Sequence, residues 1–214
     1  MKLRLNLLGL AAVAALATGG LQAQDSQFSF KFGLLSPMGD LKTGTTQVDR
    51  GSSSPPPRYS AVPVLQTKGP GYNLELGWDL LPTQDLGIGI GVQAGWMSFR
   101  ADKSVVYGAA AKASYFGMDL IYQVQDTGLT IRTGPLMASW DITQKTGLNP
   151  ATQQPVPGSS GALGETNWKL GWRLGAEYKI TPKWSVTAIY GFSSWKTAIN
   201  PSWLGVQAGY KFNF

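Results

Sequence analysis

The chain has 214 residues, of which only 14% are charged, and it contains neither cysteine nor histidine. These absences exclude disulfides, thiol chemistry and a lipid-modified N-terminal cysteine, and they remove the commonest general base and transition-metal ligand, so no cofactor is expected. The formal net charge is +6, but the basic residues are scattered singly, which is not the pattern of a nucleic-acid-binding protein.

The first 23 residues have the three parts of a secretory signal peptide, namely a short basic start, an apolar run and a small-residue end. The apolar run, Leu5–Ala17, is shorter than the ~20 residues that span a bilayer, which argues against a membrane-anchoring helix. We expect cleavage after Ala23, with the small-x-small pattern Ala15–Ala17 as the alternative site. The mature chain, 24–214, is then expected to form one domain.

From Gln27 onward, apolar residues alternate with polar or small ones, which is the period of a β-strand. Each alternating segment is close to the ~9–11 residues that a tilted strand needs to cross a bilayer. Eight is the smallest even number of strands in bacterial barrels. The sequence therefore predicts an all-β fold, an eight-stranded antiparallel up-and-down transmembrane β-barrel. The predicted strands are Phe28–Leu34, Tyr72–Leu80, Leu86–Trp96, Tyr115–Val124, Leu129–Ala138, Trp168–Ile180, Trp184–Ser193 and Trp203–Phe214.

The connections between these strands alternate in length. In chain order they are Met38–Pro70, Leu81–Asp85, Phe99–Val106, Gln125–Gly128, Asp141–Asn167, Thr181–Lys183 and Trp195–Pro201. The short connections all stand at even positions, as expected for periplasmic turns when the N-terminus is periplasmic and the longer loops are extracellular. Two long connections are rich in Ser, Pro and Gly around Ser52–Pro57 and Gln153–Gly161, and we expect both segments to be mobile and exposed.

Alternation alone would also fit a soluble calycin-like barrel whose apolar face points inward. The more polar face is rich in glycine with isolated charges, whereas the outside of a soluble barrel would carry many Lys, Glu and Thr residues. The other face is broadly apolar with aromatic residues near the strand ends, which is typical of a lipid-facing band with aromatic girdles. We therefore favour the membrane barrel. The expected lipid-facing positions include Leu74, Ile90, Leu120, Leu174 and Val206, and Gly91 and Gln207 are expected to face inward.

The girdles can be assigned from the position of each aromatic residue along its strand. Trp96, Trp168 and Trp172 are expected near the extracellular boundary. The periplasmic boundary is expected to hold Trp184 together with Tyr122, Phe212 and Phe214.

The C-terminal residues Tyr210-Lys211-Phe212-Asn213-Phe214 end in phenylalanine and have aromatic residues at alternate positions. This segment resembles the C-terminal signature of outer-membrane barrel proteins, which implies that the barrel assembly machinery reads Tyr210, Phe212 and Phe214. The opening segment Phe28–Asp40, with strand aromatics followed by Gly33 and Gly39-Asp40, resembles the outer-membrane β-barrel domain group of OmpA-, OmpX- and OmpW-type proteins.

That resemblance covers the whole mature chain and implies export through the periplasm to the outer membrane of a Gram-negative bacterium. It also implies outer-membrane lipid as the surroundings and a monomeric barrel. Full OmpA-type proteins carry a periplasmic peptidoglycan-binding domain that this sequence lacks, so no cell-wall tether is implied.

Charged residues on the inward face are the candidate functional groups. They are Lys31, Glu75, Asp79, Asp119, Arg132, Lys169, Arg173, Glu177, Lys179 and Lys211. They could line a conduit or form a carboxylate active site, but side chains just fill an eight-stranded barrel, and buried charges must be paired. We therefore predict a charge cluster that closes the lumen, made of Glu75, Arg132, Arg173 and Glu177.

Gly87–Gly91 does not have the spacing of a nucleotide-binding loop, and no predicted helix follows it. Enzymatic eight-stranded outer-membrane barrels, the lipid A acyltransferases and deacylases, are similar in architecture, but their chemistry relies on histidine. We therefore expect no enzyme, and no catalytic, cofactor-binding or metal-binding residues. The favoured function is a structural or surface-interaction role through long extracellular loops, with a plugged lumen. The alternative is a narrow porin-like or OmpW-like conduit for small or apolar solutes.

Overall fold

The computed structural model describes residues 27–49, 59–81, 87–102, 108–144, 161–164, 168–194 and 200–213. The predicted signal peptide and its cleavage site lie outside these residues. So do Ser52–Pro57 and Phe214. Within the described ranges, no helix is long and apolar enough to cross a membrane.

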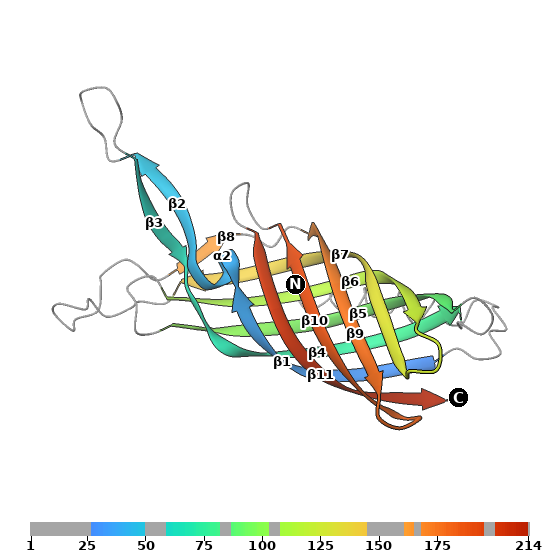
Figure 1. The fold of residues 1–214 in the computed structure, drawn as a ribbon. Coiled ribbons are helices and arrows are strands. Elements are labelled where there is room, and N and C mark those ends of the chain that lie inside the picture. Colours follow the sequence, from blue (N-terminus) through green and yellow to red (C-terminus); the bar gives the residue numbers. More distant parts are fainter. Residues whose placement is uncertain are drawn as a thin grey trace, which may run out of the picture.

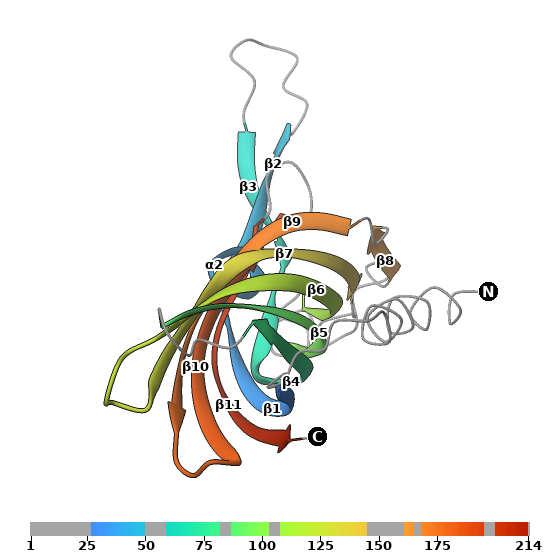
Figure 2. The same ribbon diagram turned by 90° about the vertical axis from the view of Figure 1, so that its right-hand side faces the viewer.

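Eight strands form a closed antiparallel barrel, which confirms the predicted fold (Figures 1 and 2). Each strand pairs with its neighbours, and the first pairs with the last to complete the circle. The strands are β1 (Gln27–Met38), β4 (Thr67–Leu81), β5 (Ile88–Ala101), β6 (Ala109–Gln123), β7 (Leu129–Gln144), β9 (Trp168–Lys179), β10 (Trp184–Ser193) and β11 (Pro201–Asn213).

The strands are staggered as they pass round the barrel. The stagger can be measured by starting at Lys31 on β1 and stepping from each residue to its partner on the next strand. In one direction, through β4, β5, β6 and β7, the steps reach Lys169 on β9. In the other direction, through β11 and β10, they reach Lys179 on β9, which is ten residues from Lys169. A stagger of this size in an eight-stranded barrel corresponds to a strand tilt of about 40°. Residues at the same height in the lumen therefore stand at different distances from their strand ends.

Side chains alternate between the interior and the outer surface along every barrel strand. On β10, exposed and buried residues alternate at each position. The outward positions carry apolar residues with large exposed fractions, and the expected lipid-facing residues are among them. Their exposed fractions are 41% for Leu74, 36% for Ile90, 53% for Leu120, 50% for Leu174 and 55% for Val206. Gly91 and Gln207 face inward and are buried.

The two ends of the barrel differ. The turn end holds the connections 82–87, 124–128 and 180–183 and both ends of the barrel sheet, Gln27 and Asn213. The opposite end, called the loop end below, holds the longer connections. Several strands reach further toward the loop end than the sequence predicted. β6 begins at Ala109 rather than Tyr115, and β7 ends at Gln144 rather than Ala138.

The first long connection contains regular structure, although the sequence predicted a flexible loop there. It contains helix α2 (Gly39–Thr43) and an antiparallel hairpin of β2 (Gly44–Asp49) and β3 (Tyr59–Leu65). β-Branched residues such as Thr45, Thr46 and Val62 favour these strands. Figure 1 shows the hairpin projecting beyond the loop end.

Residue Gln66 alone separates β3 from β4. Its carbonyl accepts hydrogen bonds from the backbone N–H groups of Ala109 (2.8 Å) and Asp102 (3.3 Å). The base of the hairpin is thereby fixed to the β5 and β6 wall.

A short strand, β8 (Gly161–Gly164), pairs with the end of β7. Gly161, expected to be mobile, therefore belongs to a strand. The rest of Gln153–Gly161 lies outside the described residues.

Candidate functional site: the barrel interior

The interior of the barrel contains a charged layer toward the turn end and an apolar layer toward the loop end. Eight ionisable side chains form the charged layer, and all but one have at most 5% of the side chain exposed. The exception is Asp79, at 18%. The four acids are Glu75, Asp79, Asp119 and Glu177, and the four cations are Lys31, Arg132, Arg173 and Lys211. The layer is therefore neutral as a whole.

Glu177 on β9 is surrounded by three cations. Its Oε2 lies 2.9 Å from Lys31 Nζ and 3.0 Å from Arg132 Nε, and its Oε1 lies 2.7 Å from Lys211 Nζ. Arg132 also donates from both terminal nitrogens to Asp79, at 2.8 and 2.7 Å. This planar two-bond pairing is the strongest geometry for an arginine and a carboxylate.

Arg173 joins a second group of acids. Its NH1 donates to Glu75 Oε2, and its NH2 donates to Asp119 Oδ2 at 3.2 Å. Glu75 Oε2 also accepts from the hydroxyl of Tyr115 at 2.8 Å. Lys31 Nζ lies 3.9 Å from Glu75 Oε1, so one lysine links the two groups.

These contacts cross the lumen. β4 and β9 lie on opposite sides of the barrel, separated by β1, β11 and β10 on one route. The Arg173–Glu75 contact nevertheless joins them directly. Polar residues extend the network, since Asn73 donates to the Tyr115 hydroxyl at 2.7 Å, and Gln207 donates to Asn73 and Glu75. The network therefore joins opposite walls of the barrel.

The apolar layer lies toward the loop end and centres on Trp140, which is fully buried. The Trp140 ring lies 5.9 Å from that of Trp203 in an edge-on arrangement and 6.5 Å from that of Phe99. Its indole N–H donates to Ser193 Oγ at 2.7 Å. Other buried side chains complete the layer, namely Leu35, Leu41, Met97, Ala109, Ala111, Ala113, Leu136, Ala138 and Ile142.

Inward glycines make room for the largest interior rings. A Cβ atom on Gly191 would lie 2.5 Å from the Trp203 ring, and one on Gly95 would lie 2.5 Å from the ring of Tyr115. Real Cβ atoms do not approach that closely, so these positions accept only glycine while the rings stay in place. At these two positions the inward glycine is therefore required by the packing of the interior rings.

The structure brings all four residues of the predicted charge cluster into one network. Glu75 pairs with Arg173, and Glu177 pairs with Arg132. The sequence-based selection missed four members, Lys31, Asp79, Asp119 and Lys211, although all were recognised as inward charges. Two other inward candidates do not belong, because Lys169 is exposed at the loop end and Lys179 is only half-buried at the turn end.

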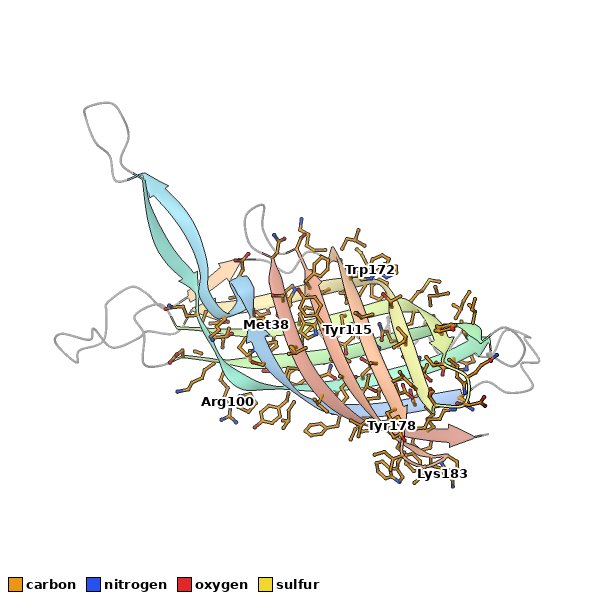
Figure 3. All side chains as sticks on the ribbon, viewed as in Figure 1. Met38, Arg100, Tyr115, Trp172, Tyr178 and Lys183 are labelled. Carbon is orange, nitrogen blue, oxygen red and sulfur yellow. The ribbon has the colours of Figure 1, made fainter. Side chains whose placement is uncertain are left out.

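The expected girdle tryptophans lie on the outer surface. Their exposed fractions are 39% for Trp96, 40% for Trp168, 47% for Trp172 and 52% for Trp184. Figure 3 shows Trp172 and Tyr178 on the outside of the wall. Tyr210 and Phe212 of the C-terminal signature pack edge-on at 4.8 Å, and Tyr210 also contacts Trp184 at 5.0 Å. How deep these rings lie in a membrane stays a prediction.

The chemistry available in this interior is limited. Each acid of the charged layer contacts at least one cation, so its charge is balanced by a neighbouring side chain. The described residues contain no group of three or more His, Cys, Asp or Glu side chains placed to hold a metal ion. The arrangement is that of a structural ion-pair network.

The comparison with protein families agrees with this architecture. The family model described as outer membrane protein beta-barrel domain matches residues 8–212. No curated protein matches the chain. Solved structures with a similar fold include Ail, the attachment invasion locus protein of Yersinia pestis, with 11% identity and a TM-score of 0.48 over 88% of this chain and 98% of that one. OprG from Pseudomonas aeruginosa has 11% identity and a TM-score of 0.48, covering 88% and 97%. Neisserial surface protein A has 12% identity and a TM-score of 0.47, over 88% of this chain and 96% of that one.

Proposed function

Because this chain belongs to the outer membrane β-barrel domain family, and so lies in the outer membrane, we propose that it is a closed barrel that presents its loop end to the outside. In such barrels the short turns face the periplasm and the longer loops face the cell exterior. The turn end, with Gln27 and Asn213, is then periplasmic, and the β2–β3 hairpin stands outside the cell. The protein acts through that exposed surface rather than through its lumen.

The observation that supports this proposal is the pair of side-chain layers inside the barrel. The ion-pair layer joins opposite walls, and the Trp140 layer lies above it on the way to the loop end. An ion crossing the barrel would have to separate paired buried charges and then pass an apolar layer, and both steps are costly. The interior of an eight-stranded barrel is just wide enough for side chains to fill it, which favours the closed form.

The proposal assigns no reaction to the barrel. The interior carboxylates are held by cations, as described above, and the chain has no histidine or cysteine to act as base or nucleophile. Mass spectrometry of membrane lipids with and without expression of the protein tests this point. A lipid species that depends on the protein would contradict it.

Planar-bilayer recording tests the closed lumen. The folded wild type should give no steady conductance, because no wet path crosses both layers. Trp140→Ala combined with Arg173→Ala and Glu75→Ala removes side chains from both layers and should create measurable conductance, which shows that the assay can detect an opened barrel. Leu120→Ala on the outer wall is the matched control and should stay silent. Steady conductance of the wild type would refute the closed lumen and favour the conduit.

A further inference from the structure

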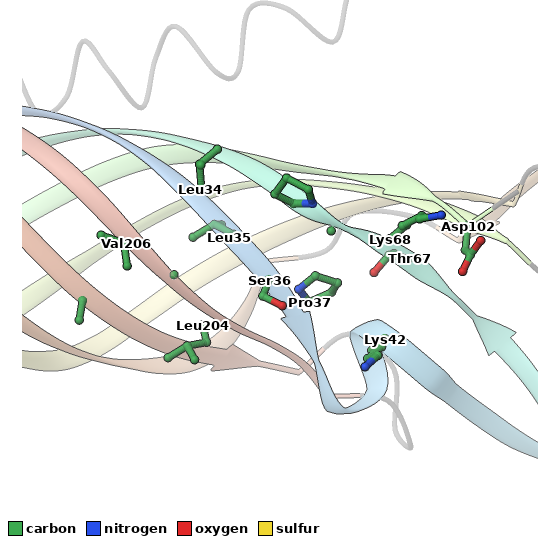
Figure 4. Close-up of a pocket in the computed structure, with 14 residues that line it drawn as sticks. Leu34, Leu35, Ser36, Pro37, Lys42, Thr67, Lys68, Asp102, Leu204 and Val206 are labelled. Carbon is green, nitrogen blue, oxygen red and sulfur yellow. The ribbon is translucent and has the colours of Figure 1, made fainter. Parts of the chain in front are cut away.

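A groove of about 770 Å³ lies on the loop-end half of the barrel wall, where β1 and β4 separate (Figure 4). β1 pairs with β4 only as far as Leu35, which lies opposite Gly71, whereas it continues to pair with β11 as far as Met38. Outward apolar side chains line one part of the groove, notably Leu34, Leu204 and Val206. Small residues, including Ser36, leave the groove open. An elongated apolar ligand would fit along this lining.

Several cations lie at the edge of the groove that is nearer the loop end. Lys42 of α2 and Lys68 of β4 line it, and both are exposed. Lys68 is directly opposite Arg100 in the β4–β5 ladder, and Arg100 is also exposed and projects outward (Figure 3). Like charges at directly opposed positions repel each other and destabilise a sheet. Among the described residues none of these three cations has an ion-pair partner, so the site would gain from a bound anion. Asp102 is the one acid on the described lining.

The order of residues along the outer wall indicates where the cations and the apolar lining of the groove lie relative to a bilayer. Tyr72, four residues along β4 from Lys68, is outward and stacks on Phe32 at 6.5 Å. The Arg100 guanidinium lies 5.7 Å from the centre of the Tyr72 ring. From the loop end downward, the wall therefore presents cations, then aromatic rings, then aliphatic residues. Aromatic rings of this kind sit at the level of lipid headgroups, which places the cations at the phosphates and the groove among the upper acyl chains.

We propose that this groove binds a phosphorylated, acylated lipid of the outer leaflet. One acyl chain lies along Leu34, Leu204 and Val206, and a headgroup phosphate sits between Lys68 and Arg100, with Lys42 nearby. An added peptide strand fits less well, because Pro37 and Pro70 on the separated strands lack the N–H groups that would bind its backbone. The proposal does not depend on whether the lumen is closed.

The test uses the chain folded in phosphatidylcholine nanodiscs and diphosphorylated lipid A as the probe, with native mass spectrometry as the readout. Wild type should retain lipid A. Each surface cation near anionic lipid changes the affinity by about fivefold, so Lys68→Gln with Arg100→Gln should weaken retention about 25-fold. Lys183→Gln, an exposed lysine at the turn end (Figure 3), is the matched control and should retain lipid A like wild type. Lys42→Gln lies outside the barrel wall and should weaken binding without any risk to the β4–β5 ladder.

A second variant tests the apolar part of the groove. Ser36→Phe places a ring in the groove and should displace the lipid, whereas Ala208→Phe, at an exposed position on β11, should not. Dephosphorylated lipid A should bind weakly, and inorganic phosphate should neither bind measurably nor compete. Unchanged retention in the Lys68/Arg100 variant or in Ser36→Phe would overturn the proposal. Inorganic phosphate binding as tightly as lipid A would show a plain anion site, which would also overturn it.

Discussion

Replacing Glu177 with glutamine should lower the free energy of unfolding by about 3–5 kcal/mol, the usual cost of breaking a buried ion pair from one side. The substitution keeps the shape of the side chain but removes the charge that faces three cations within 3.0 Å. Arg132 retains Asp79 and Lys31 retains a distant contact with Glu75, whereas Lys211 has no other ion-pair partner in the described part of the chain. The loss should therefore be at the upper part of that range.

The magnitude can be compared within the same layer. Asp119 contacts one cation, Arg173, at 3.2 Å, and Arg173 keeps its contact with Glu75. Asp119→Asn should cost only about 1.5–3 kcal/mol, the value of one hydrogen bond to a charged group. Asp126→Asn in the exposed turn is the control and should cost close to nothing, because asparagine also tolerates its positive φ of 58°.

Urea unfolding of the folded barrel in detergent micelles, followed by tryptophan fluorescence, measures these differences. Adding Lys211→Met to Glu177→Gln should cost less than the sum of the two single changes, with a coupling of about 0.5–3 kcal/mol. In a water-filled lumen the three cations would simply be hydrated. A loss below about 1 kcal/mol for Glu177→Gln, at the level of a solvent-exposed pair, would therefore refute the buried-network reasoning.

Two further predictions concern the outer wall and assembly. Fluorescence of Trp172 and Trp184 should be quenched most strongly by lipid probes near opposite interfaces, because the two lie toward opposite ends of the barrel; strongest quenching of both by probes at the bilayer centre would contradict the girdles. Phe212→Ala should slow insertion by the barrel assembly machinery while the refolded barrel loses about 1–3 kcal/mol or less, since its side chain is exposed to lipid; unchanged insertion in cells would remove Phe212 from the signature.

The existence of all eight barrel strands could be predicted because apolar and polar residues differ strongly along most of their length. The loop ends of β6 and β7 were missed where the polarity of the two faces reverses. There Ala109, Ala111 and Ala113 of β6 and Trp140 and Ile142 of β7 face inward. The outward positions carry charged residues, Lys112 and Asp141, so the apolar outward face that marked the strands ends before them.

The charged layer was predicted in kind but not in full membership. Inward direction follows from position parity, so every member was recognised as inward. The height of a residue in the barrel does not follow from its parity, because the ten-residue stagger shifts neighbouring strands relative to one another. Lys211 is close to the end of its strand, yet it reaches Glu177. Only the pairing register, which the alternation pattern does not contain, places them together.

The junction at Gln66 has a mechanical consequence. Because β3 runs into β4 with a single residue between them, tension applied to the hairpin is delivered directly along β4. β4 is held by hydrogen-bonded ladders to β1 on one side and β5 on the other, so pulling it lengthwise must shear many bonds at once instead of opening them one by one. A force applied to the hairpin from outside the cell would thus act directly on the barrel wall, and the hairpin would transmit that force to the membrane-embedded barrel.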